Sequence, residues 1–89
     1  MSPELERSVC ETPAMRVTFD RDANMGYIRL AAIEDGAAVQ QVPVHEPGRD
    51  SARFVLDFDY EGRLLGIEIF DATESLPWEV LEEADAPGP

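Results

Sequence analysis

The amino-acid sequence predicts an α+β domain, a small antiparallel β-meander of four to five strands with a short C-terminal helix. Two segments, residues 16–30 and 53–70, alternate apolar with polar side chains around turn-forming residues, which is typical of hairpins. A third segment, residues 73–84, has apolar residues at a helical spacing. The chain has 89 residues, of which 44% are hydrophobic, and this suffices for one thin core.

These segments fall into one predicted domain with an arm and a tail. We expect the single β-rich domain to span residues 15–84. A Ser-Pro pair near the start favours a helical turn that ends at Pro13, so residues 1–14 are predicted to be a flexible or partly helical arm. Residues 85–89 are predicted to be a disordered tail.

The first hairpin is predicted over residues 16–30. Val17 and Phe19 share one face of a strand, because side chains two residues apart point the same way. Residues 20–26 are dense in turn formers, and the alternation then resumes in residues 27–30. Two strands joined by such a loop form a hairpin.

A third strand and a second hairpin follow. Residues 39–44 are predicted to form a strand in which Pro43 favours an edge or a bulge, because proline cannot donate a ladder hydrogen bond. Residues 53–58 and 65–69 alternate on both sides of a Tyr-Glu-Gly-Arg turn. One buried face explains this pattern, so these residues predict the closing hairpin.

The last predicted element is one short helix. Ser75 can cap it, Pro77 lies in its first turn, and Trp78, Leu81 and Ala84 recur at a spacing of three. The residue before a proline is restricted to extended conformations, so the start of the helix is defined only to within one or two residues.

The charge of the chain is strongly acidic and uneven. There are 19 acidic and 7 basic side chains, for a net charge of -12, and residues 57–89 hold ten acids and only Arg63. An acidic chain argues against nucleic acid as a partner, because phosphates demand a basic surface. No apolar run is long enough for a membrane span, and we expect a cytoplasmic protein.

One segment resembles a calcium-binding loop. Asp57, Asp59, Glu61 and Glu68 stand at or near the oxygen-ligand positions of that pattern, with a glycine at its sixth position. The pattern requires a helix on each side, whereas both flanks here alternate with period two. A hairpin turn is therefore the favoured interpretation, and we predict neither a metal nor another cofactor.

The sequence shows no arrangement of residues suited to catalysis. Nucleophilic catalysis needs a nucleophile beside an oriented base. His45 is the only histidine and stands in a predicted loop, while Cys10, the only cysteine, stands in the predicted arm. We expect the protein not to be an enzyme.

The predicted helix offers a candidate partner-binding surface. Trp78, Glu79, Leu81, Glu82 and Glu83 combine an aromatic residue with acids. Trp78 either anchors the helix on its own sheet or, with the acids around it, docks on a basic protein partner.

Two stretches carry a family resemblance. The chain contains VTFDRDANMGYIRL at residues 17–30 and FVLDFDYEGRLLGIEIFDA at residues 54–72. They are similar to the signature stretches of a prokaryotic family, domain of unknown function 2283. The resemblance implies a small, mainly antiparallel β domain of the cytoplasm without an assigned activity. It also implies an antitoxin or binding role, because members of that family occur beside genes for small toxin-like proteins.

Three functional hypotheses follow. The first is a non-enzymatic protein-interaction domain that forms a homodimer, because a thin sheet with apolar residues on both faces and exposed edges gains most by pairing. The second is an antitoxin-like partner that neutralises a small basic toxin through the acidic second half. The third is a module that binds a small molecule or a cation.

Overall fold

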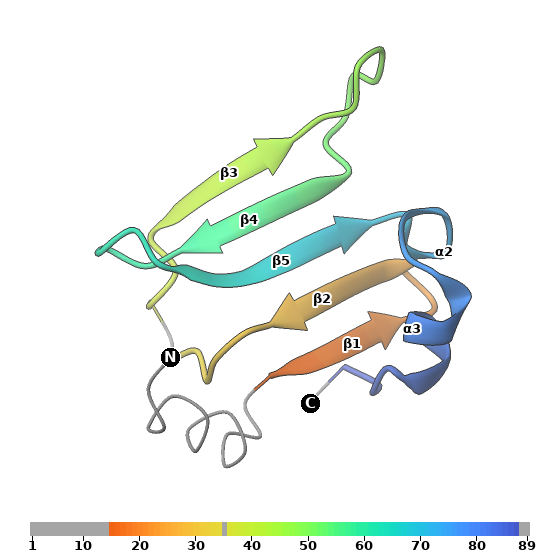
Figure 1. The fold of residues 1–89 in the computed structure, drawn as a ribbon, viewed down its shortest axis with the longest axis horizontal. Coiled ribbons are helices and arrows are strands. Elements are labelled where there is room, and N and C mark those ends of the chain that lie inside the picture. Colours follow the sequence, from red (N-terminus) through yellow and green to blue (C-terminus); the bar gives the residue numbers. More distant parts are fainter. Residues whose placement is uncertain (1–14, 35, 88–89) are drawn as a thin grey trace, which may run out of the picture.

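The computed structural model describes residues 15–34 and 36–87. Its strands are β1 (Arg16–Asp20), β2 (Met25–Arg29), β3 (Gln40–Val44), β4 (Phe54–Phe58) and β5 (Leu64–Phe70). Two short helices follow, α2 (Ala72–Ser75) and α3 (Trp78–Glu83) (Figure 1). The predicted α+β class, with an antiparallel sheet and C-terminal helical structure, is confirmed. The predicted arm lies outside the described residues.

The strand order differs from a strictly consecutive one. All neighbouring strands are antiparallel, and the order across the sheet is β1-β2-β5-β4-β3. The two hairpins therefore lie side by side, and β3 extends the sheet at one edge (Figure 1). Ile67 and Ile69 give β5 the apolar character of a central strand, whereas Pro43 in β3 lacks an amide donor and suits an edge.

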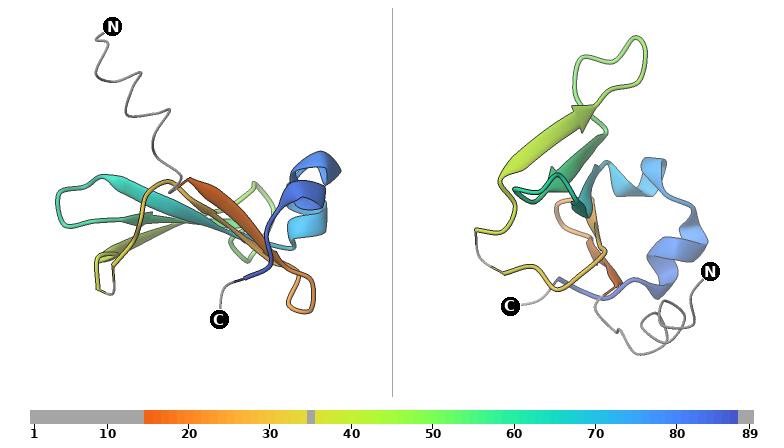
Figure 2. Two further views of the ribbon diagram at one scale, coloured as in Figure 1. Left: turned by 90° about the horizontal axis from the view of Figure 1, so that it is seen from below. Right: turned by 60° about the vertical axis from the view of Figure 1, so that its left-hand side comes forward.

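The sheet has one apolar face and one polar face. Two rows of directly paired residues on the apolar face are Phe19, Gly26, Ile69, Phe54 and Val44, and Val17, Ile28, Ile67, Leu56 and Val42. None of these residues is charged. Both helices lie on this side of the sheet (Figure 2). Ala72 and Leu81 of the helices form a buried core with Phe19 and Ile69.

Side chains and backbone conformations explain both hairpin turns. Asp20 Oδ1 accepts hydrogen bonds from the amides of Asp22 (3.0 Å) and Ala23 (3.2 Å), which makes an Asx-type turn between β1 and β2. In the turn between β4 and β5, Gly62 has a φ of 80°, a conformation that glycine adopts without steric cost.

The single helix predicted over residues 73–84 is divided in two. Leu76 is extended, with φ -124° and ψ 150°, because the ring of Pro77 disfavours a helical conformation in the residue before it. Ser75 was expected to cap the helix but ends α2, and its hydroxyl donates to the carbonyl of Phe70 at 2.8 Å. No helix among the described residues is long and apolar enough to cross a membrane.

Among the described residues, only one of the two sheet edges pairs with another segment. Asp85 pairs with β1: its amide donates to the carbonyl of Val17 and its carbonyl accepts from the amide of Phe19, both at 2.9 Å. The predicted disordered tail is therefore bound at its first residue. Within residues 15–34 and 36–87, no segment pairs with the outer edge of β3.

Candidate functional site

Burial along the two apolar rows changes from β1 to β3. Phe19 is 8% exposed and Ile69 is fully buried, whereas Val44 at the β3 end of the same row is 40% exposed. Val42, at the β3 end of the second row, is 37% exposed, and Leu56 beside it is half-buried. The helices thus cover one part of a continuous apolar face. We call the other part, formed by Val42, Val44 and Leu56, the uncovered face.

The polar face holds a network that connects four strands. The Tyr27 hydroxyl donates to Asp57 Oδ2 at 3.0 Å. The Gln41 side-chain amide donates to Asp57 Oδ1 at 3.0 Å and to Glu68 Oε2 at 2.9 Å. Asp57 is only 5% exposed. Alternation assigned these residues to a face, but which strands neighbour each other across the sheet was not visible in the sequence, so the network was missed.

The surroundings of this network keep its tyrosine neutral. Burial, followed by the hydrogen bond to Asp57, raises the pKa of Tyr27 far above its usual value. Burial also raises the pKa of Glu68, and the Asp57 carboxylate adds to that rise. The Tyr27 ring lies so close to Gly66 that an added Cβ would clash with the tyrosine ring and its hydroxyl. The Asp57 and Glu68 carboxylates therefore accept hydrogen bonds from neutral donors, in a network that joins four strands.

The four residues of the calcium-loop pattern are divided between the polar network and the turn between β4 and β5, where Glu61 Oε1 lies 3.4 Å from Arg63 Nη2. Asp57 and Glu68 belong to the polar network, whereas Asp59 closes the turn between β4 and β5. Asp59 Oδ1 accepts from the amides of Glu61 and Arg63, both at 2.9 Å, and Oδ2 accepts from Arg63 Nε at 2.9 Å. The backbone hydrogen bond from Arg63 is the main cause that lowers the pKa of Asp59.

Asp57, on the polar face, and Asp59, in the turn between β4 and β5, are both largely buried. Asp57 is 5% exposed and Asp59 is 9% exposed. Asp57 is covered because Tyr27 and Gln41 from neighbouring strands bond to it, and Asp59 because it folds beneath its own turn. Among the residues that the structure describes, no three His, Cys, Asp or Glu side chains are grouped so that they could hold a metal ion.

The structure separates the residues of the predicted partner-binding helix. Leu81 is 2% exposed and packs in the core, so its assignment to a partner surface is wrong. Trp78 is 55% exposed, so Leu81 rather than Trp78 fixes α3 to the sheet. Glu79, Glu82 and Glu83 are exposed. The aromatic and acidic residues of α3 remain available for contact.

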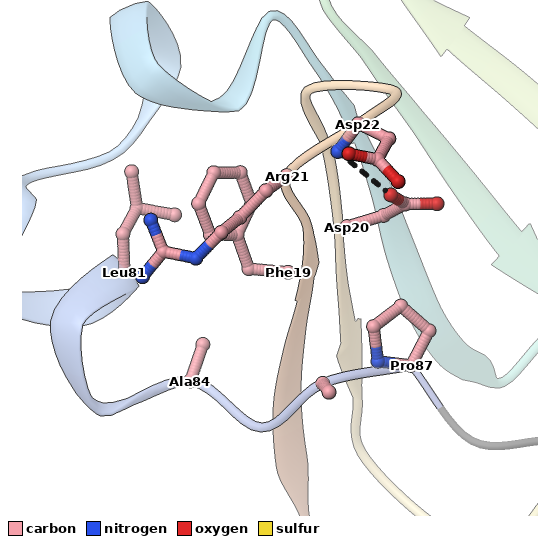
Figure 3. Close-up of a pocket in the computed structure, with 8 residues that line it drawn as sticks. Phe19, Asp20, Arg21, Asp22, Leu81, Ala84 and Pro87 are labelled. Atoms are coloured by element: carbon pink, nitrogen blue, oxygen red, sulfur yellow. Dashed lines mark hydrogen bonds between the residues drawn. The ribbon is translucent and has the colours of Figure 1, made fainter.

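A hollow of about 440 Å³ lies between the β1–β2 turn and the segment after α3 (Figure 3). The Arg21 guanidinium carbon lies 5.6 Å from the centre of the Phe19 ring, and Leu81 and Ala84 form an apolar wall. Asp20, which also lines the hollow, uses Oδ1 in its own turn. The hollow therefore combines one cation over a ring with turn carboxylates, and the described residues that line it include no nucleophile beside a base.

We compared the chain with models of known protein families. A model described as "Protein of unknown function (DUF2283)" matches residues 16–72, or 57 of 89 residues. The chain belongs to this family. The resemblance that the two hairpin sequences indicated is confirmed. Searches of curated proteins and of solved structures gave no match.

The matched residues of this DUF2283 protein contain all five strands. They include both the uncovered face and the polar network. The match ends at Ala72, the first residue of α2, so α3 and the Asp85 bridge lie beyond it.

Proposed function

We propose that this DUF2283 protein is a protein-interaction domain that acts by binding rather than catalysis and forms a homodimer through its uncovered face. The observation that carries the proposal is the change in burial along one row, from a fully buried Ile69 to a Val44 that is 40% exposed. Apolar side chains gathered on an exposed sheet face are stabilised when a second surface removes them from water.

The face suits docking better than either sheet edge does. The edge of β1 is already paired with Asp85, and Pro43 in the middle of β3 cannot donate to an added strand. A partner therefore gains little from main-chain hydrogen bonds at these edges. Packing of the uncovered face against an equivalent face, as in a β-sandwich, buries apolar surface from both sides.

Charge favours a second copy as the occupant. The chain carries a net charge of -12, but none of the strand residues in the two apolar rows is charged. Two acidic chains repel each other, and they approach most closely where neither presents carboxylates. The uncovered face meets that condition, and a two-fold axis lets the same patch contact itself. Added salt is expected to strengthen the dimer, because it screens the remaining repulsion.

The test is the mass of the protein in solution. Sedimentation equilibrium of the wild type at micromolar concentration is expected to show dimers. The variant Val42→Glu/Val44→Glu is expected to weaken association at least about 100-fold, because each dimer would bury four carboxylates. Met15→Glu is the control for an added surface carboxylate, since Met15 is 65% exposed beside the opposite sheet edge.

The folding of the two variants and the self-association of all three proteins decide whether the proposal holds. Circular dichroism is expected to show both variants folded, because the substituted side chains are exposed. A wild type that stays monomeric at about 100 µM, a concentration at which even a weak transient interface is partly occupied, would refute the homodimer. Equal weakening by the control and by the double variant would refute the assignment of the face.

A further inference from the structure

A groove on the opposite side of the molecule from β3 lies between the start of β1 and α3. Its volume is about 480 Å³. Met15, Val17 and Val80 give it apolar surface, and Glu79 and Glu83 give it carboxylates. We propose that this groove binds a basic, amphipathic segment of another protein.

The apolar part of the groove is open to contact. Met15 is 65% exposed, and Val17 and Val80 are half-buried. Strand addition is not available here, because Asp85 already bonds to the backbone of Val17 and Phe19. A partner segment must therefore bind through its side chains, with apolar groups on this surface.

Two carboxylates of the groove, Glu79 and Glu83, have no ion-pair partner within the part of the chain that the structure describes. Glu79 and Glu83 stand four residues apart on α3, where like charges repel and destabilise a helix. Glu83 also lies in the last turn, where the helix dipole disfavours acids, and no basic residue is present in that turn. A cationic partner would relieve both effects.

Arg16, the one cation among the described residues that line the groove, is already neutralised. Arg16 Nη2 lies 3.0 Å from Asp85 Oδ2, and Arg16 Nε donates to the same oxygen at 3.2 Å. Because the charges of Arg16 and Asp85 cancel, Glu79 and Glu83 give the groove a net charge of about two negative units. This excess is complementary to two lysine or arginine side chains one helical turn apart, and it repels phosphates.

The chain's own N-terminal sequence does not supply that complement. Residues 1–14 lead directly to Met15, but they contain Glu4, Glu6 and Glu11 against Arg7. Their net charge of -2 has the wrong sign for an acidic groove. The occupant is therefore a segment of a basic partner protein rather than this part of the chain.

A designed peptide tests the proposal on the full-length protein. The probe is an N-acetylated, C-amidated helical peptide of leucine, alanine and lysine, with two lysines one turn apart beside an apolar stripe. Its affinity is measured by calorimetry, and the emission of Trp78, the only tryptophan, reports whether binding occurs at α3. We expect binding that weakens as salt rises from about 20 to 300 mM.

Two charge-matched variants locate the binding site. Glu79→Gln/Glu83→Gln is expected to weaken peptide binding about tenfold, and Glu74→Gln/Glu82→Gln, which removes as much charge outside the groove, less than about twofold. Met15→Gln is expected to weaken binding by about threefold, because it removes apolar contact without changing charge.

Three results would overturn the proposal. They are no binding of the lysine peptide, equal weakening by the two double variants, and equal binding of a control peptide with glutamine in place of lysine. The Val42→Glu/Val44→Glu variant is expected to bind the peptide with unchanged affinity, because the two surfaces lie at opposite sheet edges. The groove and the proposed dimer can therefore fail separately.

Discussion

The two halves of the sheet share one sequence pattern but differ in what covers them. In β1, β2 and β5 the alternating apolar residues lie beneath α2 and α3, and Ile69 is fully buried. In β3 and β4 the same alternation leaves Val42 and Val44 exposed. Alternation therefore identifies an apolar face, but only the position of the helices decides whether the chain itself covers that face.

The two edges of the sheet differ in the same way as its two halves. The outer edge of β1 is paired by Asp85, while β3, at the other edge, includes Pro43 and is exposed along its whole length. One half is thus completed by the chain and the other ends in solvent. The polar network on the opposite face joins the halves, since Tyr27 in β2 and Gln41 in β3 both bond to Asp57.

The largest expected effect is the loss of stability when a buried side chain of the covered half is shortened. Ile69→Ala in the covered half is expected to lower the free energy of unfolding by about 2–5 kcal/mol, because it leaves a cavity in a thin core. Val42→Ala in the uncovered half is expected to cost less than about 1 kcal/mol in the monomer. Urea unfolding at low protein concentration measures both, and equal losses would break the contrast.

A second prediction concerns the junction between the halves. Gly66→Ala is expected to destabilise the fold by about 1–3 kcal/mol, because the new Cβ meets the Tyr27 ring and the carbonyl of Ile28. In a Tyr27→Ala background the same substitution is expected to cost less, because only the backbone contact remains. A double-mutant cycle from urea unfolding measures the coupling, and strict additivity would show that the ring does not lie over Gly66.

The smallest expected effect is the pH dependence of the polar network. Because burial raises the pKa of Glu68 in the folded state, its ionised form is disfavoured there, and stability is gained as pH falls through the folded pKa. Glu68→Gln is therefore expected to be more stable than the wild type at pH 7, by less than about 1 kcal/mol after solvent screening.

The difference between Glu68→Gln and the wild type is expected to vanish near pH 4, where the wild-type side chain is also neutral. Thermal unfolding between pH 4 and 8 measures it. Glu74→Gln removes the same formal charge from an exposed site on α2 and serves as the control. A variant less stable than the wild type across this range would show that the Glu68 carboxylate stabilises the network when ionised.

Local patterns in the sequence predicted the parts of the fold that depend on local chemistry. Both hairpins follow from alternation and from turn residues such as Asp20 and Gly62. The restriction that Pro77 places on the preceding residue was recognised in the sequence, but it breaks the helix in two instead of moving its start. The strand order was not predictable in this way, because pairing between β2 and β5 is nonlocal.

The candidate site depends even more on contacts between residues that are far apart in the sequence. The polar network needs Tyr27, Gln41 and Asp57 brought together from three strands, and no spacing in the sequence encodes that register. The exchange of roles between Trp78 and Leu81 has a similar cause. Helical spacing placed both on one apolar stripe, but α3 is only six residues long and its contact with the sheet is made through Leu81.

The most direct test of the account is contact between protomers across the uncovered face. In a sample that mixes isotope-labelled and unlabelled protein, isotope-filtered NMR detects only proximities between different chains. We predict intermolecular NOEs from the methyl groups of Val42, Val44 and Leu56. Intermolecular NOEs from the polar face or the β1 edge without any from these methyl groups, or none at all at millimolar concentration, would contradict the account.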